Sequence, residues 1–119
     1  MKDNITTIQE LKDKINRFIL DRDWQQFHNA KNVSMAIAAE AAELMEQFLW
    51  LDLKQADEAM KTKATAIEHE IADVLYMVLC LCNKYNIDVM TIIEQKMEHN
   101  AQKYPIEKSK GRAVKYTEL

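Results

Sequence analysis

The chain has 119 residues and a mass of 13.9 kDa, which fits one domain. Hydrophobic residues make up 48% and charged residues 29%, a balance that excludes wholesale disorder. The net charge is −3, but the segment from Lys103 to Lys115 carries +4 and the rest −7. A basic tail on an acidic body argues against duplex binding, which needs a broad basic face, and favours a small polyanion bound together with metal ions.

The scarcity of glycine and proline predicts an all-helical protein. Gly111 and Pro105 are the only residues of these types, and a sheet needs many tight turns. Phosphate-binding glycine loops are excluded for the same reason. The longest apolar run, residues 74–82, is far shorter than the roughly 20 residues of a membrane span. Because the first residues lead into no apolar signal segment, we expect a cytoplasmic protein.

Four helices are expected, arranged as a bundle-like fold in one domain of residues 1–119. Thr7 and Glu10 have the spacing of a capping box, which predicts a first helix from Thr7 to about Leu20. A polar connection follows over residues 21–31. We expect further helices over residues 32–51, 63–85 and 88–102, the last with Asp88 as N-cap, and a loop or short helix over residues 52–62. Residues 104–119 are predicted to form an irregular basic tail.

The second and third helices are more apolar than surface helices. Between Ser34 and Leu51 the only charged residues are three glutamates, and no Lys or Arg lies between Lys63 and Lys84. A monomer of this length has too small an interior to bury such helices, so we expect an oligomer. Cys80 and Cys82 point about 200° apart on one helix and cannot form a disulfide with each other. They are predicted to be buried thiols, with a redox or metal role as the alternative.

Two pairs of acidic residues are the candidate chemical site. Glu40 and Glu43 are three residues apart on the second helix, and Glu70 and Asp73 repeat this spacing on the third. Each pair lies in apolar sequence, and burying four carboxylates without basic partners would be very costly. A divalent cation removes the problem, and an all-oxygen donor set favours Mg²⁺ or Mn²⁺. Glu46 lies about 120° from Glu40 around the helix and could join the set only in part.

Three other interpretations of these acidic residues fit the sequence less well than a metal site. A Glu-x-x-Glu pair is common on solvated helix faces, but a second pair and the missing counter-charges disfavour that interpretation. A di-iron bundle needs Glu-x-x-His motifs, and no histidine here stands three residues after a glutamate. His69-Glu70 begins a zinc-protease motif, yet position 73 is Asp and not His.

With these residues in place, the sequence resembles the MazG-like all-α nucleoside triphosphate pyrophosphohydrolases, and most of all their dCTP pyrophosphatase branch. The resemblance runs over residues 20–119. It rests on Glu40-x-x-Glu43 and Glu70-x-x-Asp73, and on the blocks Asp23-Trp24-Gln25-Gln26-Phe27-His28, Gln47-Phe48-Leu49-Trp50, Val74-Leu75-Tyr76, Lys96-Met97, Asn100, Lys103-Tyr104-Pro105 and Lys115-Tyr116-Thr117-Glu118-Leu119.

The resemblance implies hydrolysis between the α- and β-phosphates of a deoxynucleoside triphosphate, dCTP-like substrates being favoured. The products would be the nucleoside monophosphate and pyrophosphate, and the role would be cleaning of the nucleotide pool. By analogy the four acids Glu40, Glu43, Glu70 and Asp73 are the catalytic residues and hold Mg²⁺, which would lower the pKa of an attacking water. Which carboxylate accepts the proton stays open, with Glu43 and Glu46 as candidates.

The resemblance also implies a set of substrate-binding residues. Aromatic faces can stack a nucleobase, and a basic tail can clamp a triphosphate. The matching positions are Trp24, His28, Trp50 and Tyr76 for the base, Asn100 near the sugar and phosphates, and Lys110, Arg112 and Lys115 in the tail, with Lys108 contributing less. The alternative for the aromatic residues is packing, and for the tail a frayed, solvated terminus. His69 and His99 are expected to be surface or packing residues.

The family typically assembles as a dimer of dimers, so the resemblance implies a homotetramer with sites built from more than one chain. One departure concerns Ile15, because eukaryotic members of the branch carry a histidine at this position. Losing that polar group leaves open a wider specificity, including dUTP or dATP. A non-catalytic nucleotide-binding module is the alternative of a different class. No nucleic acid and no membrane are expected as partners.

Overall fold

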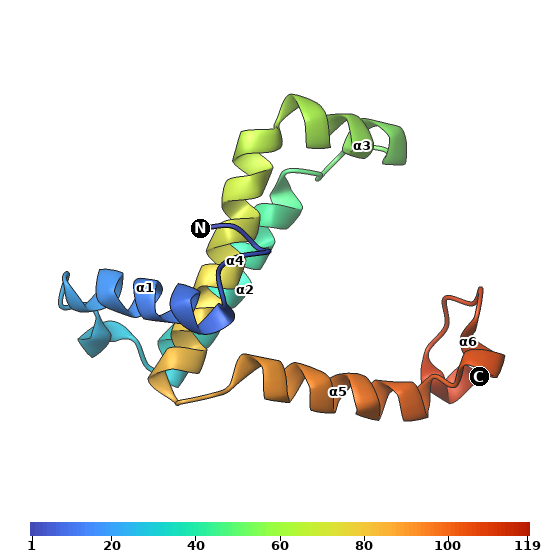
Figure 1. Cartoon of the computed structure of the whole chain (residues 1–119). Helices are drawn as coiled ribbons and strands as arrows, with labels where there is room; N and C mark the ends of the chain where they lie inside the picture. Colours follow the sequence, from blue (N-terminus) through green and yellow to red (C-terminus); the bar gives the residue numbers. More distant parts are fainter. The chain divides into compact units, whose positions relative to one another are not determined.

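The computed structural model describes residues 1–119 and consists of helices without strands, as predicted. Its contacts divide the chain into two compact units, Met1–Asn86 and Ile87–Leu119. The first contains α1 (Ile8–Leu20), the 3₁₀ turn η1 (Gln25–Phe27), α2 (Ala30–Glu46), α3 (Leu53–Thr62) and α4 (Ala64–Lys84) (Figure 1). The second contains α5 (Val89–Lys103), α6 (Ile106–Ser109) and the 3₁₀ turn η2 (Tyr116–Glu118). None of these helices has the length and apolar character that a membrane span requires.

Helix α1 begins and ends where the sequence predicts. The Thr7 hydroxyl accepts a hydrogen bond from the backbone N–H of Glu10 at 3.1 Å, and the Glu10 carboxylate accepts one from the backbone N–H of Thr7 at 2.7 Å. This capping box satisfies two N–H groups that a helix start leaves without partners. The inner face of the helix buries Ile15 and Ile19.

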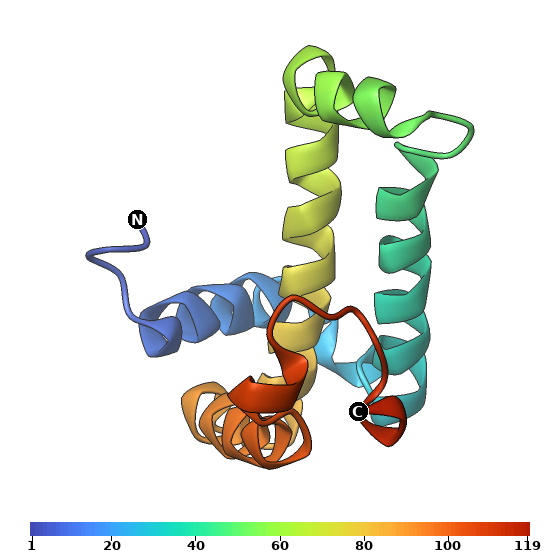
Figure 2. The same ribbon diagram turned by 90° about the vertical axis from the view of Figure 1, so that its right-hand side faces the viewer.

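Helices α2 and α4 form the centre of the first unit. They run antiparallel and side by side, and α3 lies at one end of the pair (Figure 2). Helix α4 also contacts α1 and α3. Val33 of α2 and Ile67 and Leu79 of α4 are each 1% exposed and form the centre of the core. Cys80 and Cys82 are buried free thiols, which confirms their prediction as core residues.

The prediction for the second helix was wrong at its end. Helix α2 starts at Ala30, because the Asn29 side chain accepts a hydrogen bond from the backbone N–H of Asn32 at 2.9 Å. It ends at Glu46 and not at Leu51, because residues 47–50 turn away and Trp50 adopts a positive φ of 70°. The segment predicted as a loop or short helix is α3, which starts with a capping box of Asp52 and Gln55.

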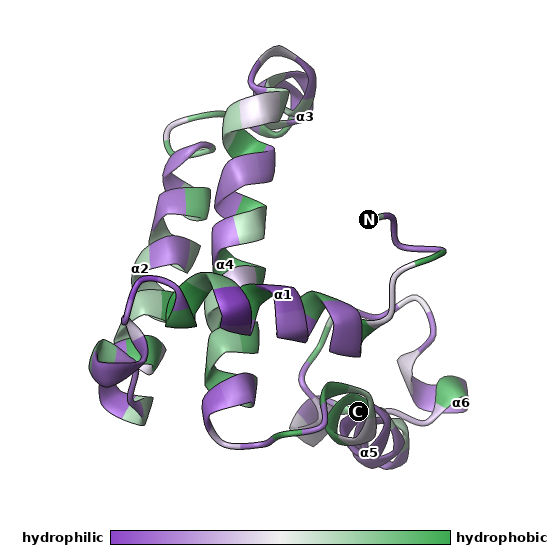
Figure 3. Cartoon of the chain, turned by 60° about the vertical axis from the view of Figure 1, so that its left-hand side comes forward, coloured by the Kyte–Doolittle hydropathy of each residue, from purple (hydrophilic) through white to green (hydrophobic).

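Helix α4 follows its predicted range closely and is followed by a break at Asn86, whose φ is 53°. The C-terminal half of α4 is mostly hydrophobic (Figure 3). Ile71 and Leu75, one turn apart, each expose about half of their surface. Such exposed apolar side chains are compatible with assembly, and the oligomeric state stays a prediction.

In the second unit, α5 begins at the predicted cap, where the Asp88 side chain accepts a hydrogen bond from the backbone N–H of Thr91 at 2.9 Å. The tail predicted to be irregular has no helix over residues 110–115 but contains the short α6 and η2, and it folds against the end of α5. The rings of Tyr104 and Tyr116 meet edge to face at 6.1 Å, and the backbone N–H of Tyr116 donates to the Tyr104 hydroxyl. Lys103 Nζ lies 4.5 Å from the Tyr116 ring centre. Pairing of distant aromatic residues orders a segment whose local sequence predicts no structure.

Candidate functional site

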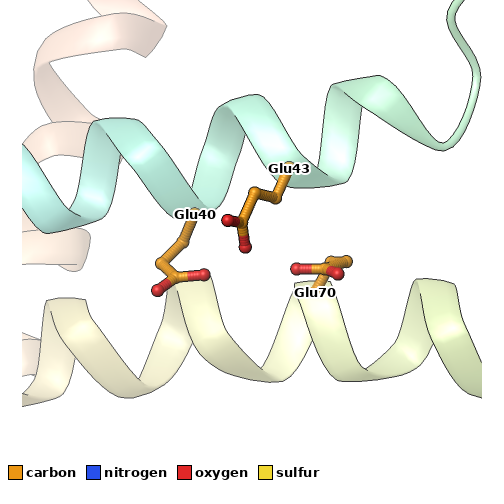
Figure 4. A group of neighbouring side chains, drawn as sticks. All are labelled: Glu40, Glu43 and Glu70. Atoms are coloured by element: carbon orange, nitrogen blue, oxygen red, sulfur yellow. The ribbon is translucent and has the colours of Figure 1, made fainter.

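Three glutamates of the first unit converge between α2 and α4. Glu40 and Glu43 project from α2 toward α4, and Glu70 projects from α4 toward them (Figure 4). One carboxylate oxygen from each residue can be chosen so that all three lie within 4.8 Å of one another. The antiparallel pairing of the two helices therefore brings together side chains that are distant in sequence. Asp73, the fourth predicted ligand, is not within this radius but acts on both Glu40 and Glu70 electrostatically.

The predicted burial of all four acids was wrong within a single chain. Glu40 and Glu70 are half-buried, whereas Glu43 and Asp73 are exposed. A pair of helices buries only the stripe along which the two helices touch, and residues beside that stripe stay open to solvent. The cluster is thus open on one side, and an ion or a phosphate group can reach it.

The local charges make the cluster unfavourable without a cation. Partial burial raises the pKa of Glu40, and a hydrogen bond with Glu43 and repulsion by Glu43, Asp73 and Glu70 raise it further. Burial likewise raises the pKa of Glu70, together with the negative charges of its neighbours. The Oε2 atom of Glu70 is buried without a hydrogen-bond partner. Every charged group that shifts these two pKa values is an acid.

These observations fit a hard divalent cation. A buried carboxylate oxygen without a partner is costly, and a cation held among three carboxylates would remove both this cost and the mutual repulsion. The donor set consists of oxygen atoms alone, which is typical of Mg²⁺ or Mn²⁺ and not of zinc. The cluster can therefore bind a metal, although the identity of the ion is not fixed by these residues.

Two of the predicted base-binding residues lie in one aromatic cluster, which Phe18 of α1 joins together. The Phe18 ring meets Trp24 edge to face at 5.9 Å and Tyr76 at 6.2 Å. Trp24 is 42% exposed, so it is only partly used for packing. Tyr76 lies one turn after Asp73; its hydroxyl is buried without a partner, and burial raises its pKa to about 12. Phe18 is not among the site residues predicted from the sequence, and only its contacts with two distant rings reveal this bridging role.

Trp50 and His28 occupy different surroundings. Trp50 is 91% exposed on the turn after α2, so the packing alternative for this residue is wrong within the chain. His28 is half-buried and lines a small cavity of about 30 Å³ together with Gln25, Cys80 and Asn83. The Oε1 atom of Gln25 is buried there without a hydrogen-bond partner. The two other histidines, His69 and His99, are exposed, as the surface interpretation predicts.

The remaining predicted substrate residues, Asn100, Lys110, Arg112 and Lys115, belong to the second unit and are exposed. The Arg112 guanidinium donates to the backbone carbonyl oxygens of Lys108 at 3.5 Å and Glu118 at 3.4 Å. The basic segment is thus a folded loop, which argues against a frayed terminus. The part of these residues in substrate binding stays a prediction.

Comparisons with known proteins identify the family. The MazG-like family model matches residues 35–119, and the chain belongs to this family. The chain is 34% identical over 115 residues to dCTP pyrophosphatase 1 of Rattus norvegicus and 30% identical to that of Homo sapiens, in both cases over 95% of this chain and 68% of the relative. A crystal structure of a pyrophosphatase from Archaeoglobus fulgidus superimposes with a TM-score of 0.81 at 34% identity, over 88% of this chain and 98% of the other.

Proposed function

We propose that this chain is a Mg²⁺-dependent pyrophosphohydrolase that converts a deoxynucleoside triphosphate, with dCTP favoured, to the monophosphate and pyrophosphate. Its membership of the MazG-like family and its pyrophosphatase relatives make it a nucleoside triphosphate pyrophosphatase. The observation that carries the choice of a metal-dependent reaction is the convergence of Glu40, Glu43 and Glu70, with one buried oxygen lacking a partner.

Glu40, Glu43, Glu70 and Asp73 would hold the ion. When bound, Mg²⁺ supplies positive charge beside the phosphates and lowers the pKa of water. The half-buried Glu40 and Glu70 would form the inner side of the site. The exposed Glu43 and Glu46 are the two candidates to accept a proton from the attacking water, since both remain accessible from the open side.

The substrate would bind through its base and its phosphates. Trp24 and Tyr76 meet at Phe18 and offer the aromatic surface against which a base can stack, with Trp50 and His28 as further candidates. Asn100 and the folded basic loop with Lys110, Arg112 and Lys115 would contact the sugar and the triphosphate. The names of the relatives support dCTP as substrate.

Ile15 bears on specificity. It is 8% exposed and forms part of the core of α1, so this position offers no hydrogen bond to a base. A pocket with one polar contact fewer would discriminate less among bases, and a broad specificity that includes dUTP or dATP is the second candidate.

We further propose that residues 1–119 act as one catalytic domain and assemble as a homotetramer, a dimer of dimers. The family match spans parts of both compact units, which supports a joint function. The exposed apolar residues of α4 and α5, among them Ile71, Leu75, Met90 and Met97, support burial against further copies of the chain.

The test is release of pyrophosphate from dCTP, dTTP, dGTP, dATP and dUTP, measured with Mg²⁺, with Mn²⁺ and with a chelator. We expect turnover that requires the metal, is fastest with dCTP, and is abolished in E43Q. The control is E68Q, which changes an exposed glutamate of α4 outside the cluster. Equal turnover of several bases would replace dCTP selectivity by the broad specificity. Absence of pyrophosphate release from every nucleotide would overturn the proposed reaction.

A further inference from the structure

Arg22 follows α1 and lies against the aromatic cluster, although no part of the proposed function so far uses it. Its Cζ atom is 3.6 Å from the centre of the Phe18 ring and 5.9 Å from that of Trp24. One of its N–H groups, at Nη1, donates to the backbone carbonyl oxygen of Phe18 at 3.0 Å. The guanidinium is therefore fixed by two different interactions and has a defined position.

The cluster around Arg22 is open to solvent. Phe18 and Trp24 are each 42% exposed, and Arg22 itself is exposed. A guanidinium carries five N–H donors, and only one of them is used by Phe18. Fixed donors thus stand beside the partly exposed ring of Trp24, and donors and an aromatic surface are the two features that recognition of a nucleobase requires.

Arg22 is also electrostatically coupled to Tyr76 and so to the helix that carries the acidic cluster. Its positive charge lowers the pKa of the Tyr76 hydroxyl, although burial dominates and the pKa is raised. Tyr76 follows Asp73 by one turn of α4. Arg22 and Asp73 both act electrostatically on Tyr76, so they lie near the same part of α4.

We propose that Arg22 is a specificity-determining residue, whose free N–H donors bind the acceptor edge of a base stacked on the cluster of Phe18, Trp24 and Tyr76. This inference rests on the proposed function and adds a selection rule to it. A guanidinium only donates, so it favours a base with two adjacent acceptors. Cytosine presents such a pair in O2 and N3, whereas uracil and thymine carry a hydrogen on N3 and offer single carbonyl oxygens.

The variant R22K separates recognition of a base from packing. Lysine retains the positive charge and an aliphatic stem for Phe18, so a purely structural role would be preserved. Lysine lacks the planar fork that can reach two acceptors at once. The matched control is R17K, which changes an exposed arginine of α1 that lies outside the aromatic cluster.

The measurement is kcat/KM for dCTP and for dUTP in wild type, R22K and R17K, with melting curves of all three. We expect R22K to lower kcat/KM for dCTP about tenfold, through a higher KM, because a bidentate contact to one base is worth about a factor of ten. The value of kcat/KM for dUTP should fall less than about threefold. R17K should change neither value, and the melting temperatures should agree. An equal loss for both nucleotides, or no loss, would overturn the role of Arg22.

Binding of the monophosphates keeps this test independent of turnover. Calorimetric titration of wild type and R22K with dCMP and dUMP requires no hydrolysis. We expect wild type to prefer dCMP and R22K to lose most of this preference. If wild type binds dCMP selectively but hydrolyses no triphosphate, the proposed reaction fails while the inference stands. Equal affinity of wild type for both monophosphates would overturn the inference.

Discussion

Glu40 of α2 and Glu70 of α4 both project into the space between the antiparallel helices, each half-buried among acidic neighbours and without a basic partner in the cluster (Figure 4). Without a cation this arrangement lowers the stability of the folded chain, because folding brings negative charges together and leaves one Glu70 oxygen without a hydrogen bond. A cation would reverse the effect. The acidic cluster therefore couples metal binding to stability.

Removing one charge from the cluster should lower the activity but raise the stability of the metal-free chain. In E43Q we expect Mg²⁺-dependent turnover to fall by at least about 100-fold, a loss typical of a missing metal ligand or general base. In a chelating buffer the melting temperature of E43Q should rise above that of wild type, because the repulsion of Glu43 on Glu40 and Glu70 is gone. E68Q should change neither property. Wild-type turnover in E43Q would remove this residue from the site.

The free energy of unfolding of the metal-free chain should fall as the pH rises above 4.5. The folded state raises the pKa of Glu40 and Glu70 above the ordinary glutamate value of 4.5. Between that value and the raised values the folded chain binds more protons than the unfolded one, so its stability falls as pH rises. We expect urea melts in a chelating buffer to show this fall above pH 4.5, and saturating Mg²⁺ to suppress it. A rise of stability over this range would contradict the pKa directions.

Cys80 should be an unreactive thiol in the native protein. Burial raises its pKa from 9.0 to about 11, so the thiolate that reacts with disulfide reagents is scarce at pH 8. In the variant C82A, in which Cys80 is the only thiol, we expect slow labelling that becomes fast in denaturant. Stability should also fall from pH 9 toward pH 11, since the folded state retains the thiol proton. Fast native labelling would place Cys80 at an accessible surface.

The core of the first unit should depend on Leu79. This residue is 1% exposed, and L79A removes buried methyl groups and leaves a cavity, at a cost of about 2–5 kcal/mol in the free energy of unfolding. Leu53, which is 90% exposed at the start of α3, provides the matched control, and L53A should change stability by less than about 0.5 kcal/mol. Denaturant melts of the two variants measure the difference. Similar losses in both would contradict the assignment of the core.

Local signals in the sequence were sufficient for most of the helices. The capping residues Thr7 and Asp88 predicted the starts of α1 and α5, because a cap depends on atoms three residues away. The end of α2 was missed, since the positive φ of Trp50 has no local signal in a residue that rarely adopts it. The folded tail was missed for a related reason, because it depends on Tyr104 meeting Tyr116 twelve residues later.

The sequence by itself determined the helical class and the two acidic pairs, because helical periodicity places residues three apart on one face of the same helix. The tertiary structure decided which acids meet, namely Glu40, Glu43 and Glu70, and which of them are half-buried. It also decided that Arg22 lies on Phe18 beside Trp24. These contacts depend on how separate segments pack, and packing is set by the whole chain and not by spacing along it.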